Sequence, residues 1–426
     1  MLNYTKEDIF RIVEEEDVEF IRLQFTDIFG NLKNVAITVS QLEKALNNKI
    51  SFDPTAIEGY SDEGEEELFL HPDFSTFAIF PWRPQRGKVA RMICDVYRQD
   101  GTPYEGDSRY ILKQVVKEAK DLGYTFEVGP ACEFFLFQAD ENGLPTTVTY
   151  EQAGYFDLGP IDFGENARRD MVISLENMGF QVEASHHESA PAQHEIDFKA
   201  DEAIATADNI LTFKLAVKSI ARTHGLHATF MPKPKQGVDG SGMRINMKLY
   251  KDGKNIFYAP EGKDGLSEDA YHFVAGLMKH VRGMAAITNP IVNSYKRLVP
   301  GFDAPTEISY DRKNRRGMVN IPGTRDENVR ISLRSPDPTA NPYLTIALCL
   351  RAGLQGIGEK AEISDKKETM PDNLFEAIRA MESDDMIESV LGTEVFHRYS
   401  ALKKAEWNRY REQITNWEIN EYLYRF

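Results

Sequence analysis

Hydrophobic and polar residues alternate along four short segments of this sequence, as expected for β-strands with one buried face. In residues 330–334, Arg330, Ser332 and Arg334 would share one face, while the two apolar residues between them would share the other. Residues 131–135, 194–197 and 243–248 also alternate, and each carries at least one charged side chain. A sheet built from such strands has one apolar face. Its polar face is suited to lining a site for an anionic ligand or a metal ion.

The first hundred or so residues have the pattern of strands and turns. Strands are expected at residues 18–25, 33–38, 76–82 and 89–97. The stretch 100–107 contains Gly101, Pro103 and Gly106 and is rich in turn formers, so it is the best domain boundary. We therefore expect an N-terminal domain at residues 1–104 and a second domain at residues 105–426.

Helices are predicted in the second part, where apolar residues recur every three or four positions. Residues 111–122 and 171–178 show this period and are followed by Gly123 and Gly179, which suit the end of a helix. A longer helix is expected at residues 201–224, before a strand at 226–230. This alternation of helices and strands favours an α/β or α+β fold.

The charge balance limits the kinds of molecule that this protein can bind over a broad surface. The 426 residues include 67 acidic and 50 basic residues, which give a net charge of −17. This excess argues against a broad surface for nucleic acid or for an anionic membrane, and it is typical of a solvated acidic surface.

Cysteine content and the N-terminal segment indicate the compartment. The three cysteines, Cys94, Cys132 and Cys349, are widely spaced and contain no CxxC pair, which fits a reducing environment and disfavours a structural zinc site. The first residues are charged and have the pattern of a helix capped at Thr5, so we expect no signal peptide and a cytoplasmic protein.

Common nucleotide-binding motifs are missing from the sequence. It contains neither GxxxxGK[ST] nor a GxGxxG that follows a strand, so neither a P-loop nor a Rossmann phosphate site is supported.

Several longer motifs, in one order, carry a resemblance that spans nearly the whole chain. They are HHE at 186–188, QHE at 193–195, ATFMPKP at 228–234, NSYKRLVPG at 293–301 and DPTANPY at 337–343. The chain resembles bacterial type I glutamine synthetase of the Gram-positive alpha-like subtype. The resemblance implies an α+β fold, with an N-terminal β-grasp domain and a catalytic domain built on a curved antiparallel sheet with flanking helices. It also implies a homo-oligomer, a dodecamer of two hexameric rings with active sites shared between neighbours.

The resemblance implies one site for Mg²⁺ or Mn²⁺ in each subunit, held by Glu133, Glu188 and Glu195. Carboxylate oxygens are the ligands that such hard cations prefer. Taken alone, each glutamate would most often be a solvated surface residue. Their joint match to three motif positions favours the metal site.

The family's second ion, which neutralises the phosphates of ATP, has ligand positions that correspond here to Ala131, Arg244 and Ser332. The family has two glutamates and a histidine at these positions. Two carboxylates are therefore lost and one guanidinium is gained, so we expect this chain to be a divergent homologue that lacks the second metal site.

Other site residues follow from the same resemblance. Asp53, Asp303 and Arg315 correspond to catalytic positions, and Arg315 and Arg330 to nucleotide or phosphate positions, where Arg244 would also bind phosphate in place of the second cation. Substrate positions correspond to Asp239, Gly240, Arg297 and Arg334. Asp239 replaces an asparagine, and a carboxylate there would repel a substrate α-carboxylate or favour an amine.

Two interpretations stay open at this point. In the first, the chain is an ATP-dependent ligase of a carboxylate and an amine with altered chemistry, in which Arg244 replaces the second cation. In the second, it is an inactive paralogue that senses a ligand, regulates nitrogen metabolism or assembles with an active enzyme. Efficient glutamine synthesis is not expected in either case.

Overall fold

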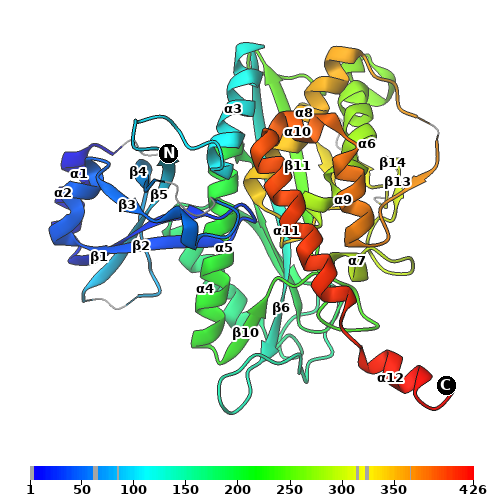
Figure 1. Cartoon of the computed structure of the whole chain (residues 1–426), viewed down its shortest axis with the longest axis horizontal. Helices are drawn as coiled ribbons and strands as arrows, with labels where there is room; N and C mark the ends of the chain where they lie inside the picture. Colours follow the sequence, from blue (N-terminus) through cyan, green and yellow to red (C-terminus); the bar gives the residue numbers. More distant parts are fainter. Residues whose placement is uncertain (1–3, 61–65, 84–85, 313–315, 322–325, 365) are drawn as a thin grey trace.

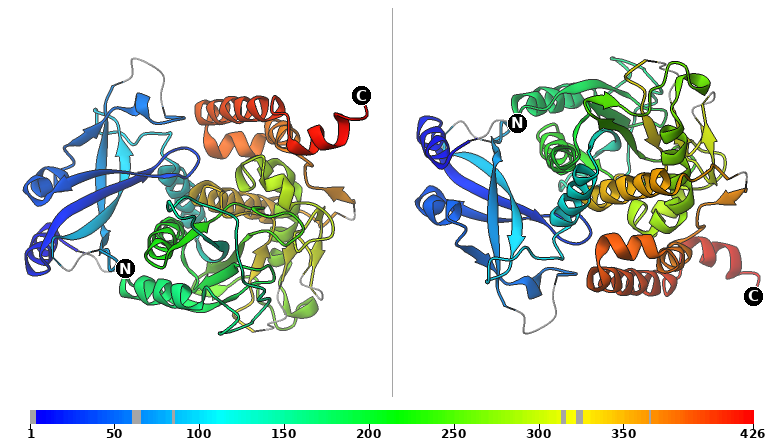
Figure 2. Two further views of the ribbon diagram at one scale, coloured as in Figure 1. Left: turned by 90° about the horizontal axis from the view of Figure 1, so that it is seen from below. Right: turned by 90° about the horizontal axis from the view of Figure 1, so that it is seen from above.

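The computed structural model describes residues 4–60, 66–83, 86–312, 316–321, 326–364 and 366–426. A small domain formed by the N-terminal strands lies beside a larger domain that contains most of the helices (Figure 1). In the views from below and above, the small sheet stands to one side and the helices of the large domain cluster on the other (Figure 2).

The small domain is a five-stranded sheet with two short helices. Its strands are ordered β2-β1-β5-β4-β3, and β1 and β5 are parallel while the other pairs are antiparallel. Thr5 accepts a hydrogen bond from Asp8 N and Asp8 accepts one from Thr5 N, so the predicted cap is a capping box. The elements are α1 (Lys6–Glu15), β1 (Val18–Thr26), β2 (Leu32–Thr38), α2 (Leu42–Leu46), β3 (Ile50–Phe52), β4 (Leu68–Ile79) and β5 (Lys88–Tyr97).

The large domain is built on a ten-stranded, mainly antiparallel sheet. Its principal order is β14-β15-β16-β11-β6-β8-β7. The strands are β6 (Tyr124–Gln138), β7 (Val182–His187), β8 (Gln193–Phe198), β9 (Asp201–Glu202), β10 (Leu226–Thr229), β11 (Met243–Lys251), β12 (Lys254–Asn255), β14 (Tyr310–Asp311), β15 (Val319–Asn320) and β16 (Ile331–Leu333). The four alternating segments of the sequence thus lie on four adjacent strands, and the α+β class is confirmed.

Helices cover the apolar face of this sheet. On β11, Met243, Ile245, Met247 and Leu249 are fully buried, while the residues between them are partly exposed. Burying each such side chain contributes roughly 1.5–3 kcal/mol, so the alternation fixes which face receives the helices. The helices are α3 (Ser108–Asp121), α4 (Glu165–Asn177), α5 (Ala203–Thr223), α6 (Glu268–Thr288), α7 (Ser294–Arg297) and α8 (Pro342–Glu359).

The C-terminal part adds a helical layer and a separate last helix. It contains α9 (Leu374–Glu382), α10 (Asp385–Leu391), α11 (Thr393–Arg411) and α12 (Asn416–Tyr422), besides the two-stranded ribbon of β13 (Glu307–Ile308) and β17 (Glu368–Thr369). Figure 1 shows α12 extending away from the rest of the chain. In the described part of the chain, no helix combines the length and the apolar character needed to cross a bilayer.

Some boundaries differ from the prediction. β4 begins at Leu68, eight residues before the predicted start, because residues 69–73 pair with β5 although their hydrophobic pattern is interrupted by His71 and Asp73. α4 begins at Glu165 because its polar first turn carries no apolar signal.

Buried polar contacts join the two domains. Arg109 on α3 is 2% exposed and binds Asp73 and Asp95 of the small domain as well as Asp208 of α5. Asn341 donates to the carbonyl of Ile28 at 3.0 Å. These contacts fix the small sheet against the helices that carry the large sheet.

Candidate functional site

Three predicted metal-binding glutamates lie together on the polar face of the large sheet. Glu133 on β6 and Glu195 on β8 are direct register partners, and Glu188 follows the end of β7. His186 joins them: its Nε2 is 3.3 Å from Glu195 Oε1, and its Nδ1 is 3.7 Å from Glu188 Oε1. Ligand atoms of His186, Glu188 and Glu195 all lie within 4.8 Å of one another. Sequence reasoning did not assign His186 to the metal site, although it lies only two residues before Glu188 in the HHE motif.

The carboxylates of this cluster strongly affect one another. Burial and repulsion from Glu195 raise the pKa of Glu188 to about 7, and the same two causes raise the pKa of Glu133 well above its usual range. Burial would also raise the pKa of Glu195, but the hydrogen bond to His186 and the charge of Arg244 lower it. Concentrated negative charge of this kind is stabilised by a cation.

The hydrogen bonds within the cluster also leave ligands for a divalent cation. Glu195 Oε2 is buried and has no hydrogen-bond partner in the described part of the chain. Glu133 is oriented from outside the cluster, because its Oε2 accepts from Gly242 N at 2.7 Å and from Gln193 Nε2 at 3.2 Å. Glu195 therefore keeps one oxygen without a donor, and the carboxylates of the cluster are ligands that suit Mg²⁺ or Mn²⁺.

Arg244 occupies a neighbouring place on the same face. Across three adjacent strands, Ala131 on β6 is the register partner of both Arg244 on β11 and Asp197 on β8. Arg244 Nη2 is 3.9 Å from Glu195 Oε2, and the side chain is 38% exposed. Although partial burial opposes it, the carboxylates of Glu195, Glu133 and Asp197 raise the pKa of Arg244. A fixed cation therefore lies beside the glutamate cluster.

Asp197 is a further residue that the sequence analysis did not single out. Burial and Glu195 raise its pKa to about 7, and its Oδ1 is buried with no hydrogen-bond partner among the described residues. The signal was available, since Asp197 and Glu195 alternate on one strand and must share a face.

Ser332 is satisfied within the sheet. It pairs with Asn246 on the adjacent strand, and its Oγ donates to Asn246 Oδ1 at 2.6 Å. The three positions compared with a second metal site thus hold an alanine, a guanidinium near carboxylates and a hydroxyl bonded to a carboxamide.

Two cavities contain several of the remaining predicted ligand residues. A cavity of about 340 Å³ is lined by Arg244 and Arg330, together with Asp197, Lys199 and Lys248. A second, of about 480 Å³, is lined by Asp239, Asp303, Arg316 and Arg334. Arg244 and Arg330 thus line a different cavity from Asp239 and Arg334.

The second cavity contains paired charges. Arg334 Nη2 lies 2.8 Å from Asp303 Oδ1, and Asp239 Oδ1 accepts from Asp303 N at 2.8 Å. Of the two acidic groups, Asp239 has no Lys, Arg or His side chain within ion-pair distance among the described residues. It remains a negative charge on the cavity wall.

Arg297 lies beneath this region and supports the backbone. It is 4% exposed and donates to the carbonyls of Ser335 at 2.9 Å and Arg334 at 3.2 Å. A Cβ at Gly242 would lie 2.5 Å from Arg297 Nη2, so only glycine allows this approach. Gly240 packs equally closely on the carbonyl of Pro232.

One predicted residue lies apart from these cavities, and another cannot be placed. Asp53 follows β3, where its Oδ1 accepts from Thr55 N at 2.9 Å, and it lines neither cavity. Arg315 lies outside the described residues.

A second cluster of metal-type ligands forms an internal network instead. Glu151, Asp162, His187 and His194 are all buried. His187 Nε2 lies 2.7 Å from Glu151, and Arg168 binds both Asp162 at 2.7 Å and His194 Nδ1 at 2.8 Å. These bonds hold the ends of β7 and β8 in place, although His194 Nε2 is buried with no partner among the described residues.

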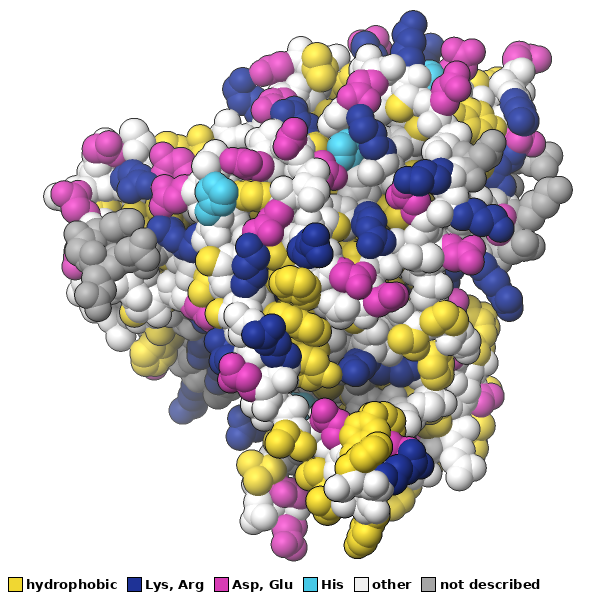
Figure 3. Space-filling model, turned by 45° about the vertical axis from the view of Figure 1, so that its right-hand side comes forward, with side chains coloured by type: hydrophobic (Ala, Val, Ile, Leu, Met, Phe, Trp, Pro, Cys, Tyr) yellow, Lys and Arg dark blue, Asp and Glu magenta, His cyan; other side chains and the backbone are white. Residues whose placement is uncertain are grey.

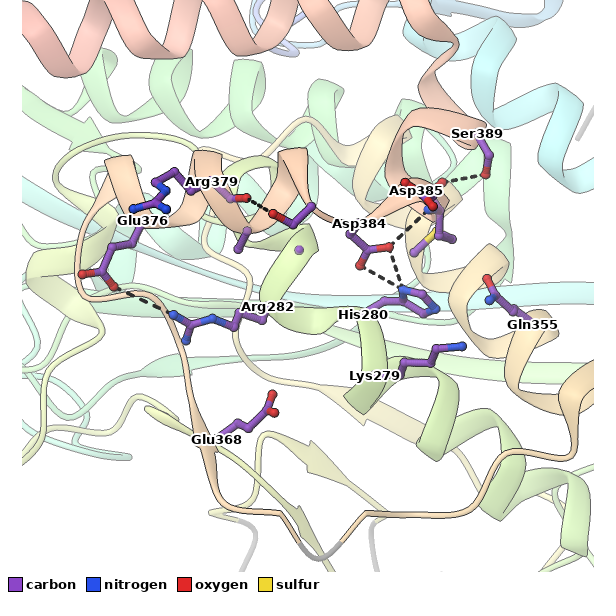
Figure 4. A pocket seen from close by; sticks show the side chains of 14 residues that line it. Lys279, His280, Arg282, Gln355, Glu368, Glu376, Arg379, Asp384, Asp385 and Ser389 are labelled. Carbon is purple, nitrogen blue, oxygen red and sulfur yellow. Dashed lines mark hydrogen bonds and ion pairs between the residues drawn. The ribbon is translucent and has the colours of Figure 1, made fainter.

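A wide cavity of about 1100 Å³ between α6, α9 and α10 lies elsewhere and contains none of these residues. Its charged groups face one another, with His280 Nδ1 bonded to Asp384 at 2.9 Å and Arg282 3.9 Å from Glu376 (Figure 4). We therefore place the candidate site on the polar face of the large sheet.

Comparison with known proteins identifies the family. The model of the glutamine synthetase catalytic domain matches residues 105–422, and that of the glutamine synthetase β-grasp domain matches residues 17–99. The chain belongs to the glutamine synthetase family. Glutamine synthetases from Clostridium saccharobutylicum and Staphylococcus aureus strain Mu50 are 55% and 50% identical to it, over 100% and 99% of both chains. The solved structure of a GmaS/ADP complex is 30% identical, with a TM-score of 0.89, and the match covers 99% of this chain and 100% of that chain.

The family accounts for both domains and for the glutamate cluster. The five-stranded N-terminal sheet is the β-grasp domain, as expected. Glutamine synthetases use divalent cations and ATP, and the glutamate cluster of this chain has ligands for such a cation.

Proposed function

We propose that this protein is a glutamine synthetase-like ligase of a carboxylate and an amine, with one divalent cation at Glu133, Glu188 and Glu195. The guanidinium of Arg244 takes the place of a second cation. The observation that carries this proposal is the position of Arg244, opposite Ala131 and 3.9 Å from Glu195. A second divalent cation at that place would meet a fixed positive charge instead of two carboxylates.

The phosphate end of the site is the cavity lined by Arg244 and Arg330. Arginine side chains bind phosphate oxygens in a planar, bidentate manner and stabilise charge on a transferring phosphoryl group. The bound cation would supply further charge neutralisation and would orient the reacting groups. The similar GmaS structure is a complex with ADP, which supports nucleotide binding by this chain.

The substrate end is the cavity with Asp239. A carboxylate there disfavours the α-carboxylate of glutamate, because two negative charges would face each other. Asp239 instead favours a substrate with a cationic amine at that point. Arg334, which is bonded to Asp303, can bind an anionic group when that pair opens.

Ordinary glutamine synthesis is therefore expected to be weak or absent. Replacing a metal that stabilises phosphoryl transfer costs several kcal/mol of barrier, which is orders of magnitude in rate. Arg244 recovers part of this stabilisation without coordinating the nucleophile or the leaving group.

A second candidate function is an inactive subunit that senses a ligand, regulates nitrogen metabolism or assembles with an active synthetase. It is favoured by the internal bond between Ser332 and Asn246, because the Ser332 hydroxyl is already engaged within the sheet instead of facing a second ion. Exposed apolar surface supports assembly in either case.

We infer that the chain forms a homo-oligomer, with a dodecamer of two rings as the expected form. On α12 and the residues that follow, Trp417, Leu423, Tyr424 and Phe426 are 63–101% exposed. The loop at residues 144–163 exposes Tyr150 and Leu158, at 78% and 69%. Hydrophobic side chains gather at the lower end of the face in Figure 3. Exposed apolar side chains gathered on one part of a surface are typical of a protein interface.

A coupled assay separates the two candidate functions. Phosphate release is measured with ATP, Mg²⁺ or Mn²⁺, and glutamate with ammonium, and then with a panel of other amines and carboxylic acids. Release with any pair that depends on both substrates excludes the inactive subunit. Absence of ATP binding by calorimetry, with either metal present, excludes the ligase.

A further inference from the structure

A cavity of about 710 Å³ lies between the two domains and contains none of the residues assigned to the candidate site. β4 and β5 of the β-grasp domain form one side, and the end of α4 and the face of α5 form the other. Phe77 and Met178 contribute apolar wall, while Asn177 and Asn209 contribute carboxamides.

Arg91 on β5 borders this cavity with much of its bonding capacity unused. It is 5% exposed, and its Nη2 donates to Thr212 Oγ1 at 3.2 Å. Its Nε is buried without a hydrogen-bond partner, and no carboxylate of the described residues lies within 4.0 Å of its nitrogens. A buried guanidinium with one neutral partner is unusual, because buried charges are normally paired.

The neighbouring carboxylates are already engaged by Arg109. Both oxygens of Asp208 bind Arg109, at 3.0 and 2.9 Å, and Oδ1 also accepts from Tyr343 at 2.6 Å. Asp73 binds Arg109 at 2.7 Å and Ser75 at 2.6 Å. Burial lowers the pKa of Arg91 to about 10, so the side chain is still charged at neutral pH.

We propose that this interdomain cavity is a binding site for a small metabolite with a single carboxylate, which pairs with Arg91. A carboxylate matches the guanidinium in geometry and charge. Arg91 is the sole basic side chain among the described residues that line the cavity, where Asp201 and Asp208 are acidic, so a monoanion fits better than a phosphate dianion. The side chains of Asn177 and Asn209 have no partner in the described part of the chain and can bond the rest of the ligand.

Such a ligand would contact both domains at once. Its binding would favour the arrangement of the β-grasp sheet and α5 found in this structure. By thermodynamic linkage, the affinity for the ligand would in turn depend on that arrangement. This site does not rest on the proposed ligase activity.

Calorimetry with the full chain tests the site. The probes are butanoate, glutaramate and L-glutamine. The control for each probe is the same compound with its carboxylate converted to a carboxamide. We expect saturable binding of at least one carboxylate, no binding of its amide, and an affinity at least about tenfold lower in Arg91→Gln. Asn209→Phe fills the cavity without removing an internal hydrogen bond and should have the same effect, so it decides the matter if Arg91→Gln does not fold.

Arg334→Gln distinguishes this cavity from the substrate cavity. Carboxylate binding should be unchanged in that variant. The proposal is overturned if none of the probes binds at about 10 mM, if binding survives in Asn209→Phe, or if Arg334→Gln alone abolishes it.

Discussion

Arg244 and Ala131 are register partners on β11 and β6, and the small alanine leaves room for the guanidinium on the polar face of the sheet. Glu195 lies 3.9 Å from the guanidinium, and Asp197 is the register partner of Ala131 on the other side. The pairing explains how the pocket can keep one cluster of glutamates while a protein cation lies next to it.

Restoring three side chains should create a second cation site. In the triple variant Ala131→Glu, Arg244→His and Ser332→Glu, we expect bound Mn²⁺ to rise from about one to about two ions per chain. Two carboxylates and an imidazole would then stand where the unaltered chain has a guanidinium and two groups that bind no cation well. Metal analysis after equilibrium dialysis measures the ratio. Arg244→His alone is the control and should stay near one ion. Two tightly bound ions in the unaltered chain would refute the proposed single-metal site.

Removing one charge from the glutamate cluster should weaken the cation. Glu188→Gln is expected to lower Mn²⁺ affinity at least about tenfold, since it removes an anionic ligand. Titration calorimetry measures the change. Glu176→Gln, on an exposed position of α4, is the matched control and should bind as the unaltered chain does. Equal affinities in the two variants would place the cation elsewhere.

Neutralising Asp239 should improve glutamate binding. Asp239→Asn keeps an oxygen that can accept from Asp303 N but removes the charge that opposes an α-carboxylate. We expect affinity for L-glutamate to increase about tenfold, or about 1.4 kcal/mol. Calorimetry compares it with Asp252→Asn, which removes the same charge from an exposed turn outside both cavities. Unchanged or weaker binding in Asp239→Asn would mean that Asp239 does not face the ligand.

The apolar surface of α12 should be needed for assembly. Trp417 is 63% exposed, and Trp417→Asp would place a charge in the inferred interface. We expect the largest assembly to be lost, as measured by light scattering or mass photometry. Asn420→Asp adds the same charge at another exposed position of α12 and controls for charge alone. If Trp417→Asp assembles like the unaltered chain, α12 is not part of the interface.

Asp107 should make stability depend on pH. Burial, with repulsion from Asp95, raises the pKa of Asp107 to about 7. A carboxyl group whose pKa is raised on folding contributes stability that is full below its unfolded pKa and is lost as the pH rises toward 7. Asp107→Asn has no titratable group at this position. The difference in unfolding free energy between the unaltered chain and this variant should therefore shrink by on the order of 2–3 kcal/mol between pH 5 and pH 7. Unfolding at several pH values measures this difference, and a constant difference would contradict the prediction.

Several features of the fold could be predicted because their signals are local. The alternation of β11 and β16, the glycine after α3 and the cap at Thr5 depend on neighbours within a few residues. The sequence pattern underestimates β4 because the first half of this strand is stabilised by pairing with β5 and not by its own alternation.

The amino-acid sequence by itself determined which side chains share a strand face, and motif resemblance indicated the three glutamates and the replaced metal positions. Only the tertiary structure decided that Arg244, Ala131 and Asp197 lie side by side, that His186 joins the glutamates, and that Arg91 borders an interdomain cavity without a carboxylate partner among the described residues. The physical reason is that alternation along a strand is set by local backbone geometry. Register between strands and contact between domains are set by packing among residues far apart in the chain.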